Sequence, residues 1–228
     1  MPISGHGFEF HVQRLGLHRR GDEVRTYGSY QVFIDGSPVP PQNGVPLGGF
    51  VCETVGPGRN HPVNNGLRIE AGRYPLTTQF GKYVSIGYSN NTHIAAQPHM
   101  PAVALAGTAD RTGILIHPGH PAEAGDPPFS FLASVGCFNL TQALQPADDM
   151  EYFESRARVI ALINSLAAFF PGAFKDAAGH QIKQNTPITG AFAVIDGEPM
   201  NVIQPAFEPD DVVASDFSVP DRNTIGSG

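Results

Sequence analysis

The first quarter of the chain alternates between apolar and polar positions. FEFHVQRLGL (residues 8–17) and SYQVFIDGSPV (residues 29–39) both follow this two-residue period, which is typical of half-buried β-strands. GGFVCETV (residues 48–55) predicts a third strand, which carries Cys52 and Glu53. Asp35 and Gly36 predict a hairpin turn, because both residue types accept the backbone of a tight turn.

The apolar runs that follow are shorter and are separated by Gly, Pro and Asn. They predict two strands in residues 67–90 with a turn at Gly81, short strands at 101–107 and 113–119, a surface loop at 118–131, a short helical turn at 140–144, and a strand and turn at 191–200. The polar tail from Glu208 onward is expected to be poorly ordered.

One segment has a helical period instead. In residues 148–170, Tyr152, Val159, Ile163, Leu166 and Phe170 recur at three- and four-residue spacing. We expect Asp148 or Asp149 to cap this helix and Pro171-Gly172 to end it.

These elements predict a mainly β (α+β) fold, with a mixed or antiparallel sheet core and one long C-terminal helix. Residues 1–147 are expected to form the β-rich domain. Residues 148–228 supply a helix, a strand and a tail that pack on it as one compact unit.

Composition narrows the choice of partners. The net charge is -7 and no basic cluster exceeds Arg19-Arg20, so nucleic acid is not expected as a partner.

No apolar run reaches the length of a membrane span, and MPISGHGFEF has neither the charged nor the apolar segment of a secretory signal. We therefore expect the chain to be cytoplasmic as made. Action at the cell wall would require a specialised secretion system or release by lysis.

The stretch GILIHPGHPAEAGDPPFSFLASVGCFNLT (residues 113–141) carries the candidate chemistry. Cys137 is a candidate nucleophile, and His117, at the end of an apolar strand, is its candidate base. Ser134 or a backbone carbonyl could orient the imidazole, and the Gly136-Cys137 pair offers N–H groups for an oxyanion hole. A buried thiol that follows a histidine by chance is the alternative, since a lone cysteine is more often a small apolar residue.

Other polar residues have simpler explanations. Four histidines, His93, His99, His117 and His120, could be drawn as a zinc cluster, but no acidic ligand accompanies them and HPGH lies on a loop. We expect no metal and no cofactor.

Charged and aromatic residues also occur on apolar segments. Glu53 and Arg68 could pair across the sheet near a cleft that Tyr74 and Lys82 line, or they could form the wet face of alternating strands. Arg156 and Arg158 are expected on the solvated face of the helix.

The same stretch resembles the active-site signature of the L,D-transpeptidase (YkuD-like) enzymes, in which a strand ends in His and a Ser/Thr-His-Gly-Cys turn follows. ILIH supplies His117, SVGC supplies Ser134, Gly136 and Cys137, and FN supplies Asn139. Val135 stands where these enzymes usually have a second histidine. The resemblance implies acyl transfer through Cys137, with His117 as the base and the peptidoglycan stem peptide as substrate.

A second likeness covers about residues 24–145. A family of small bacterial and phage proteins shows a similar order of five motifs, here VFIDG (32–36), VCETV (51–55), NGLRIEAGRYPL (65–76), GILIHPGH (113–120) and SVGCFN (134–139). His120, Asn139, Arg68 and Tyr74 lie within these motifs and are the candidate substrate-binding residues.

These resemblances predict a cysteine-dependent acyltransferase or hydrolase for cell-wall peptides, such as a secreted bacterial effector or a phage protein. The alternative is a non-catalytic structural or binding module of a phage or secretion assembly. A cysteine peptidase or amidase that acts on a different peptide is a third possibility. The oligomeric state stays open.

Overall fold

The computed structural model describes residues 3–54, 56–58, 67–88, 100–119, 129–131, 134 and 136–199. His93, His99, His120, Val135 and the tail from Glu208 lie outside them. The elements are β1 (Phe8–Arg20), β2 (Glu23–Ile34), β3 (Ser37–Pro38), β4 (Gly48–Glu53), β5 (Gly56–Gly58), β6 (Leu67–Arg68), β7 (Gly72–Thr78), β8 (Tyr83–Val84), β9 (Met100–Pro101), β10 (Val103–Leu105), β11 (Leu115–His117), β12 (Phe129–Ser130), β13 (Phe138–Thr141), β14 (Met150–Glu151), α1 (Tyr152–Phe169), η1 (Pro171–Ala173) and β15 (Pro187–Asp196).

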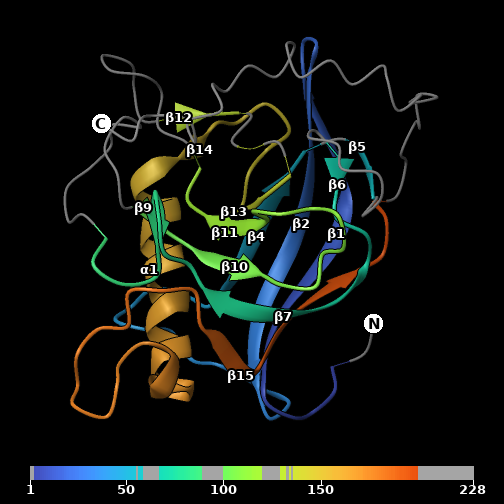
Figure 1. The fold of residues 1–228 in the computed structure, drawn as a ribbon. Coiled ribbons are helices and arrows are strands. Elements are labelled where there is room, and N and C mark those ends of the chain that lie inside the picture. The colour runs from blue at the N-terminus through green and yellow to red at the C-terminus, as the bar shows by residue number, and fades with distance from the viewer. Residues whose placement is uncertain are drawn as a thin grey trace.

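A closed barrel of 8 strands forms the centre of the molecule (Figure 1). The strand order is β1-β15-β7-β10-β11-β13-β4-β2, and the β1–β2 pairing completes the ring. The β1–β15 and β11–β13 pairs are parallel, and the other neighbours in the ring are antiparallel. The predicted β-rich fold with one long helix is confirmed, and the sheet is mixed.

The alternating pattern places apolar side chains inside the barrel. Phe8, Phe10 and Val12 of β1 belong to the main core cluster, together with residues at every second position of the other strands. The turn at Asp35 and Gly36 is confirmed, since both residues have positive φ (48° and 79°) and β2 pairs with β3 across it.

Helix α1 packs across one end of the barrel. At this end, Phe169 contacts Phe8 at the start of β1, with ring centroids 5.6 Å apart. The Ser155 hydroxyl donates to the Leu140 carbonyl of β13, and the Arg158 guanidinium donates to the Gly48 carbonyl of β4 at 2.9 Å. The helix therefore contributes to the same core that the strands enclose.

The structure corrects two expectations for the helix. It begins at Tyr152, and its N-cap is Glu151, whose carboxylate accepts from the backbone N–H groups of Phe153 and Glu154. The predicted caps, Asp148 and Asp149, lie before β14 and do not cap it. Arg158 is buried rather than solvated, because its guanidinium reaches the Tyr30 hydroxyl and Glu154.

The predicted helical turn at 140–144 is wrong. Residues 138–141 form β13, a buried strand between β11 and β4. Phe138 and Leu140 face the core, and two neighbouring strands supply its backbone partners. In the loop predicted at 118–131, Phe129 and Ser130 form β12, which pairs with β14.

No helix among the described residues is both long and apolar enough to cross a membrane.

Candidate functional site

His117 and Cys137 lie on the outer side of the barrel wall. Parallel strands β11 and β13 pair Ile116 with Phe138 and His117 with Asn139. Ile116 and Phe138 belong to the core, so the residues that alternate with them face outward. His117 ends β11, and Cys137 comes just before β13, with its sulfur beside the Leu115 N–H two residues before His117.

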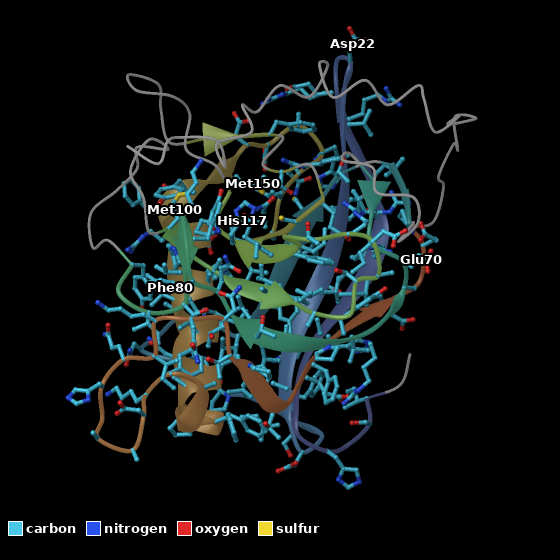
Figure 2. All side chains as sticks on the ribbon, viewed as in Figure 1. Asp22, Glu70, Phe80, Met100, His117 and Met150 are labelled. Atoms are coloured by element: carbon cyan, nitrogen blue, oxygen red, sulfur yellow. The ribbon has the colours of Figure 1, made fainter. Side chains whose placement is uncertain are left out.

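Aromatic and apolar side chains surround this face. Tyr83 packs against both the His117 ring, at a centroid distance of 4.9 Å, and the small cluster that includes Leu115 and Cys137. Tyr83 of β8 pairs with Met100 of β9, so this two-stranded sheet lies over His117 (Figure 2). The imidazole is consequently buried.

Hydrogen bonds fix the orientation of His117. Its Nδ1 lies 2.6 Å from the Pro118 carbonyl oxygen, so Nδ1 carries the hydrogen and Nε2 carries the lone pair. The Asn139 amide donates to the carbonyls of His117 (3.1 Å) and Pro118 (3.3 Å), which holds the accepting carbonyl in place. Burial lowers the pKa of His117 to about 4, and the Pro118 bond opposes this only in part. The imidazole is neutral at pH 7.

The Cys137 thiol bridges to the neighbouring strand. Its sulfur accepts the Leu115 N–H at 3.3 Å and its S–H is 3.5 Å from the Gly113 carbonyl oxygen. Burial raises the pKa of Cys137 to about 11, although the Leu115 N–H and the charge of Arg111 act in the other direction. Cys137 is half-buried as a residue, and with this pKa its thiol is protonated at pH 7.

Ser134 shapes the turn before Cys137 and does not bond to the imidazole in the contacts that the structure describes. Its hydroxyl donates to the Cys137 carbonyl at 2.8 Å and accepts the Cys137 N–H at 3.1 Å. The Cys137 N–H, expected in an oxyanion hole, is therefore already bonded in this conformation. Gly136 has a φ of 145°, a backbone that favours glycine and makes this tight approach possible.

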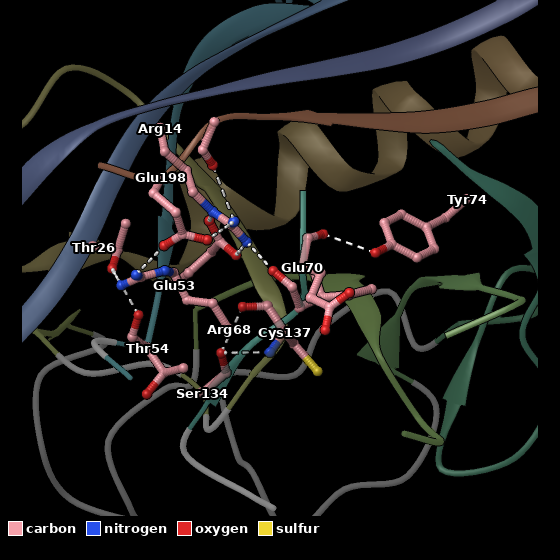
Figure 3. A network of polar contacts seen from close by, with 12 residues as sticks. Arg14, Thr26, Glu53, Thr54, Arg68, Glu70, Tyr74, Ser134, Cys137 and Glu198 are labelled. Carbon is pink, nitrogen blue, oxygen red and sulfur yellow. Dashed lines mark hydrogen bonds and ion pairs between the residues drawn. The ribbon is translucent and has the colours of Figure 1, made fainter. Parts of the chain in front are cut away.

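Arg68 and Tyr74, two of the candidate substrate-binding residues, are buried away from the solvent (Figure 3). Arg68 donates to the Thr26 hydroxyl at 2.8 Å and to the Glu198 carboxylate at 2.5 Å. The Tyr74 hydroxyl donates to the Glu70 carbonyl at 2.8 Å. Glu53, for which a pair with Arg68 or a solvated strand face was left open, is buried and forms a two-pronged ion pair with Arg14, with both N–O distances 2.8 Å.

Asn139, another candidate substrate-binding residue, and Cys52, the second cysteine, lie in paired strands next to this site. Asn139 is buried and holds His117, so its observed role is to position the imidazole. Cys52 lies beside it, paired in register with Asn139, and burial raises the pKa of its thiol to about 11. Among the described residues, no group of three His, Cys, Asp or Glu side chains is placed to hold a metal.

Two contributors to this site were missed by sequence reasoning. Tyr83 covers His117, and Arg111 acts on the Cys137 thiol through its charge. Tyr83 lies in a two-residue strand, and Arg111 lies in a loop. Neither carries a local signal of its own, because their roles depend on how distant segments pack.

Comparison of the chain with protein-family models, with curated proteins and with solved structures finds no match. The candidate site therefore rests on the geometry of this chain and on the motifs in its sequence.

Proposed function

We propose that the chain is a cysteine-dependent acyltransferase or hydrolase of the L,D-transpeptidase type that acts on peptidoglycan stem peptides. The observation that carries the proposal is the placement of His117 and Cys137 on one face of adjacent strands, with the imidazole fixed in the Nε2-basic tautomer. A cysteine nucleophile needs an oriented base beside it. The proposal assigns this role to His117, which lies two residues after Leu115, whose N–H the Cys137 sulfur accepts.

In the proposed reaction, the Cys137 S–H leaves the Gly113 carbonyl and gives its proton to Nε2 of His117 as the sulfur attacks a peptide carbonyl. The tetrahedral intermediate collapses when His117 returns the proton to the leaving amine, and a thioester remains on Cys137. Water or an acceptor amine then attacks the thioester, which restores the thiol.

The ionisation of the two groups defines how the thiol is activated. With pKa values of about 11 for Cys137 and about 4 for His117, the resting pair is a thiol and a neutral imidazole. Proton transfer then accompanies the attack, because no thiolate is stored beforehand. The oxyanion would need other donors or a rearranged Ser134 turn, since Ser134 accepts the Cys137 N–H.

Purified protein incubated with muropeptides and analysed by mass tests the proposal. We expect wild type to release or exchange a stem-peptide residue, and Cys137→Ala and His117→Gln to lose this activity. Cys52→Ser is the matched control, because it removes the other thiol on the same face of the barrel. Equal turnover by wild type and Cys137→Ala would refute catalysis at Cys137.

A second function has a specific observation in its favour. The Cys137 thiol ties two strands together through Gly113 and Leu115 and is protonated at neutral pH, as a structural thiol would be. A non-catalytic binding or structural module of a phage or secretion assembly would retain these contacts. Two measurements together separate the functions. If Cys137 is purely structural, the wild-type protein leaves muropeptides unchanged, and Cys137→Ala has a lower melting temperature than wild type.

A further inference from the structure

A cluster of arginines lies at the barrel end opposite helix α1. Arg14 comes from the middle of β1 and Arg68 from β6, and Glu53, at the end of β4, lies beside them (Figure 3). The side chains of Arg14 and Arg68 are 0% exposed. A charge enclosed to this degree is stable only when opposite charges and hydrogen bonds replace the lost water.

Glu198 supplies one of these opposite charges from the segment that follows β15. Its carboxylate oxygens lie 2.5 Å from Arg68 and 3.4 Å from Arg14, so the two guanidinium groups hold one carboxylate between them. We call Arg14 and Arg68 the arginine cradle. Unlike them, the Glu198 side chain is 44% exposed, so solvent reaches the occupant of the cradle.

The charges at this end favour an anion. Glu53 forms two bonds with Arg14, and Arg111 acts electrostatically on both Glu53 and Cys137. Arg14, Arg68 and Arg111 are all buried, and the charge of Glu53 acts on each of them. Planar guanidinium groups are suited to paired bonds with a carboxylate.

The cradle lies near the same barrel end as Cys137, but Arg14 shares the inward face of β1 with Phe10 and Val12, whereas Cys137 faces outward. The β13–β4 pairing ends at Asn139 and Cys52; Cys137 comes just before β13, and Thr54 comes just after β4. The Thr54 carbonyl accepts from Thr26, whose hydroxyl accepts from Arg68. This chain of bonds connects the cradle to the strand beside the candidate nucleophile.

We propose that the arginine cradle is a binding site for the carboxylate of a peptide, and that Glu198 is an internal occupant which such a ligand displaces. Binding of the carboxylate is independent of chemistry at Cys137. Its use for substrate rests on the proposed function, where it would hold an acidic group of the peptide at the barrel end that carries Cys137.

Removal of the occupant tests the cradle. Glu198→Ala should melt several degrees lower than wild type, and acetate at constant ionic strength should restore the melting temperature saturably, whereas acetamide should not. N-acetyl-D-alanine should restore it at lower concentration than acetate if the site takes a peptide carboxylate. Where Glu198→Ala does not fold, Glu198→Gln serves in its place, and the NMR signal of the Arg68 Nε–H group reports binding directly.

The matched control is Glu23→Ala. Glu23 is 45% exposed and pairs with Arg20, but Arg20 is itself 37% exposed. Acetate should have no specific effect on this variant, because solvent already hydrates its arginine.

Equal effects of acetate and acetamide on Glu198→Ala would overturn the proposal and leave Glu198 a structural residue. Rescue by acetate but not by N-acetyl-D-alanine would overturn the assignment to peptides. Repeating the titration in the Cys137→Ala background keeps this result separate from catalysis, because the cradle should bind with or without the thiol.

Discussion

Burial holds both partners of the candidate site in their uncharged forms. Cys137 and His117 face a packed layer that includes Tyr83, and little solvent remains to stabilise a thiolate or an imidazolium. A thiol of this kind is nucleophilic only when a base removes its proton during attack. Reactivity towards simple reagents should therefore follow pH, whereas reactivity towards a bound substrate should depend on His117.

Alkylation of Cys137 by iodoacetamide tests this ionisation. In a Cys52→Ser background, we expect slow modification at pH 7 and a rate that rises about tenfold per pH unit until it levels near the pKa of about 11. Mass spectrometry after timed quenching gives the rates. A plateau reached at neutral pH would show a pre-formed thiolate instead.

The neutral His117 also makes stability depend on pH. Its pKa is about 4 in the folded chain and near 6.5 when unfolded, so the unfolded chain binds more protons between these values. Stability is therefore full above pH 6.5 and falls as the pH drops to about 4, by up to about 3 kcal/mol from this group.

His117→Gln should flatten that part of the stability curve, as measured by urea unfolding at each pH. His18, whose pKa is also lowered to about 4, is present in both proteins and cancels in the comparison. His180→Gln removes an exposed histidine and is the control. An unchanged slope in His117→Gln would contradict the buried neutral state.

Motif spacing pointed to His117 and Cys137, but not to how they are held. Asn139 was assigned to substrate, and its amide instead supports the Pro118 carbonyl behind the imidazole. This role depends on the parallel register of β11 and β13, which no local pattern encodes. The contacts of Arg68 could not be predicted for a similar reason, because its partners Thr26 and Glu198 are distant in the chain.

At the scale of elements, the helix shows where a local rule was sufficient and where it was not. The apolar stripe and Pro171-Gly172 predicted its existence and its end correctly. The start was placed too early because Asp148 and Asp149 are better N-cap types than Glu151. Residues 150–151 instead form β14 with β12, so the chain stays extended until Glu151.

Glu151→Ala should destabilise the protein by about 1 kcal/mol, since two N–H groups of the first turn lose their acceptor. The free energy of unfolding in urea measures this loss. Asp149→Ala, which removes only the half-exposed ion pair with Arg20, should cost less than half as much. Equal losses would mean that the Glu151 carboxylate contributes nothing as a cap.

At the scale of the whole molecule, the barrel brings together segments from both ends of the described chain. Alternation predicted most of the strands, but strand order depends on pairings between distant residues, such as Phe8 with Ala191. The hydrophobic pattern defines which face of a strand is buried, and it does not define which strand lies next to it. The closed ring could therefore not be derived from the sequence.

The Arg14–Glu53 pair is the ionic part of that interior. Glu53→Gln should destabilise the fold by roughly 3 kcal/mol or more, because it leaves a buried guanidinium without its main counter-charge. The double variant Arg14→Met/Glu53→Leu should recover much of this loss, since apolar pairs often replace buried ion pairs without penalty. Denaturant unfolding measures the loss in each variant, and a double variant no more stable than Glu53→Gln would contradict this expectation.

Closure by β15 also sets the order of events when the chain folds. This strand lies between β1 and β7 in the ring, yet among the strands that the structure describes it comes last in the sequence. Until residue 196 has emerged, the nascent chain can form only an open sheet with unpaired edges at β1 and β7. Closure of the barrel thus follows the synthesis of β15 and carries a high loop-closure cost, and any factor that binds the unfinished chain encounters those edges.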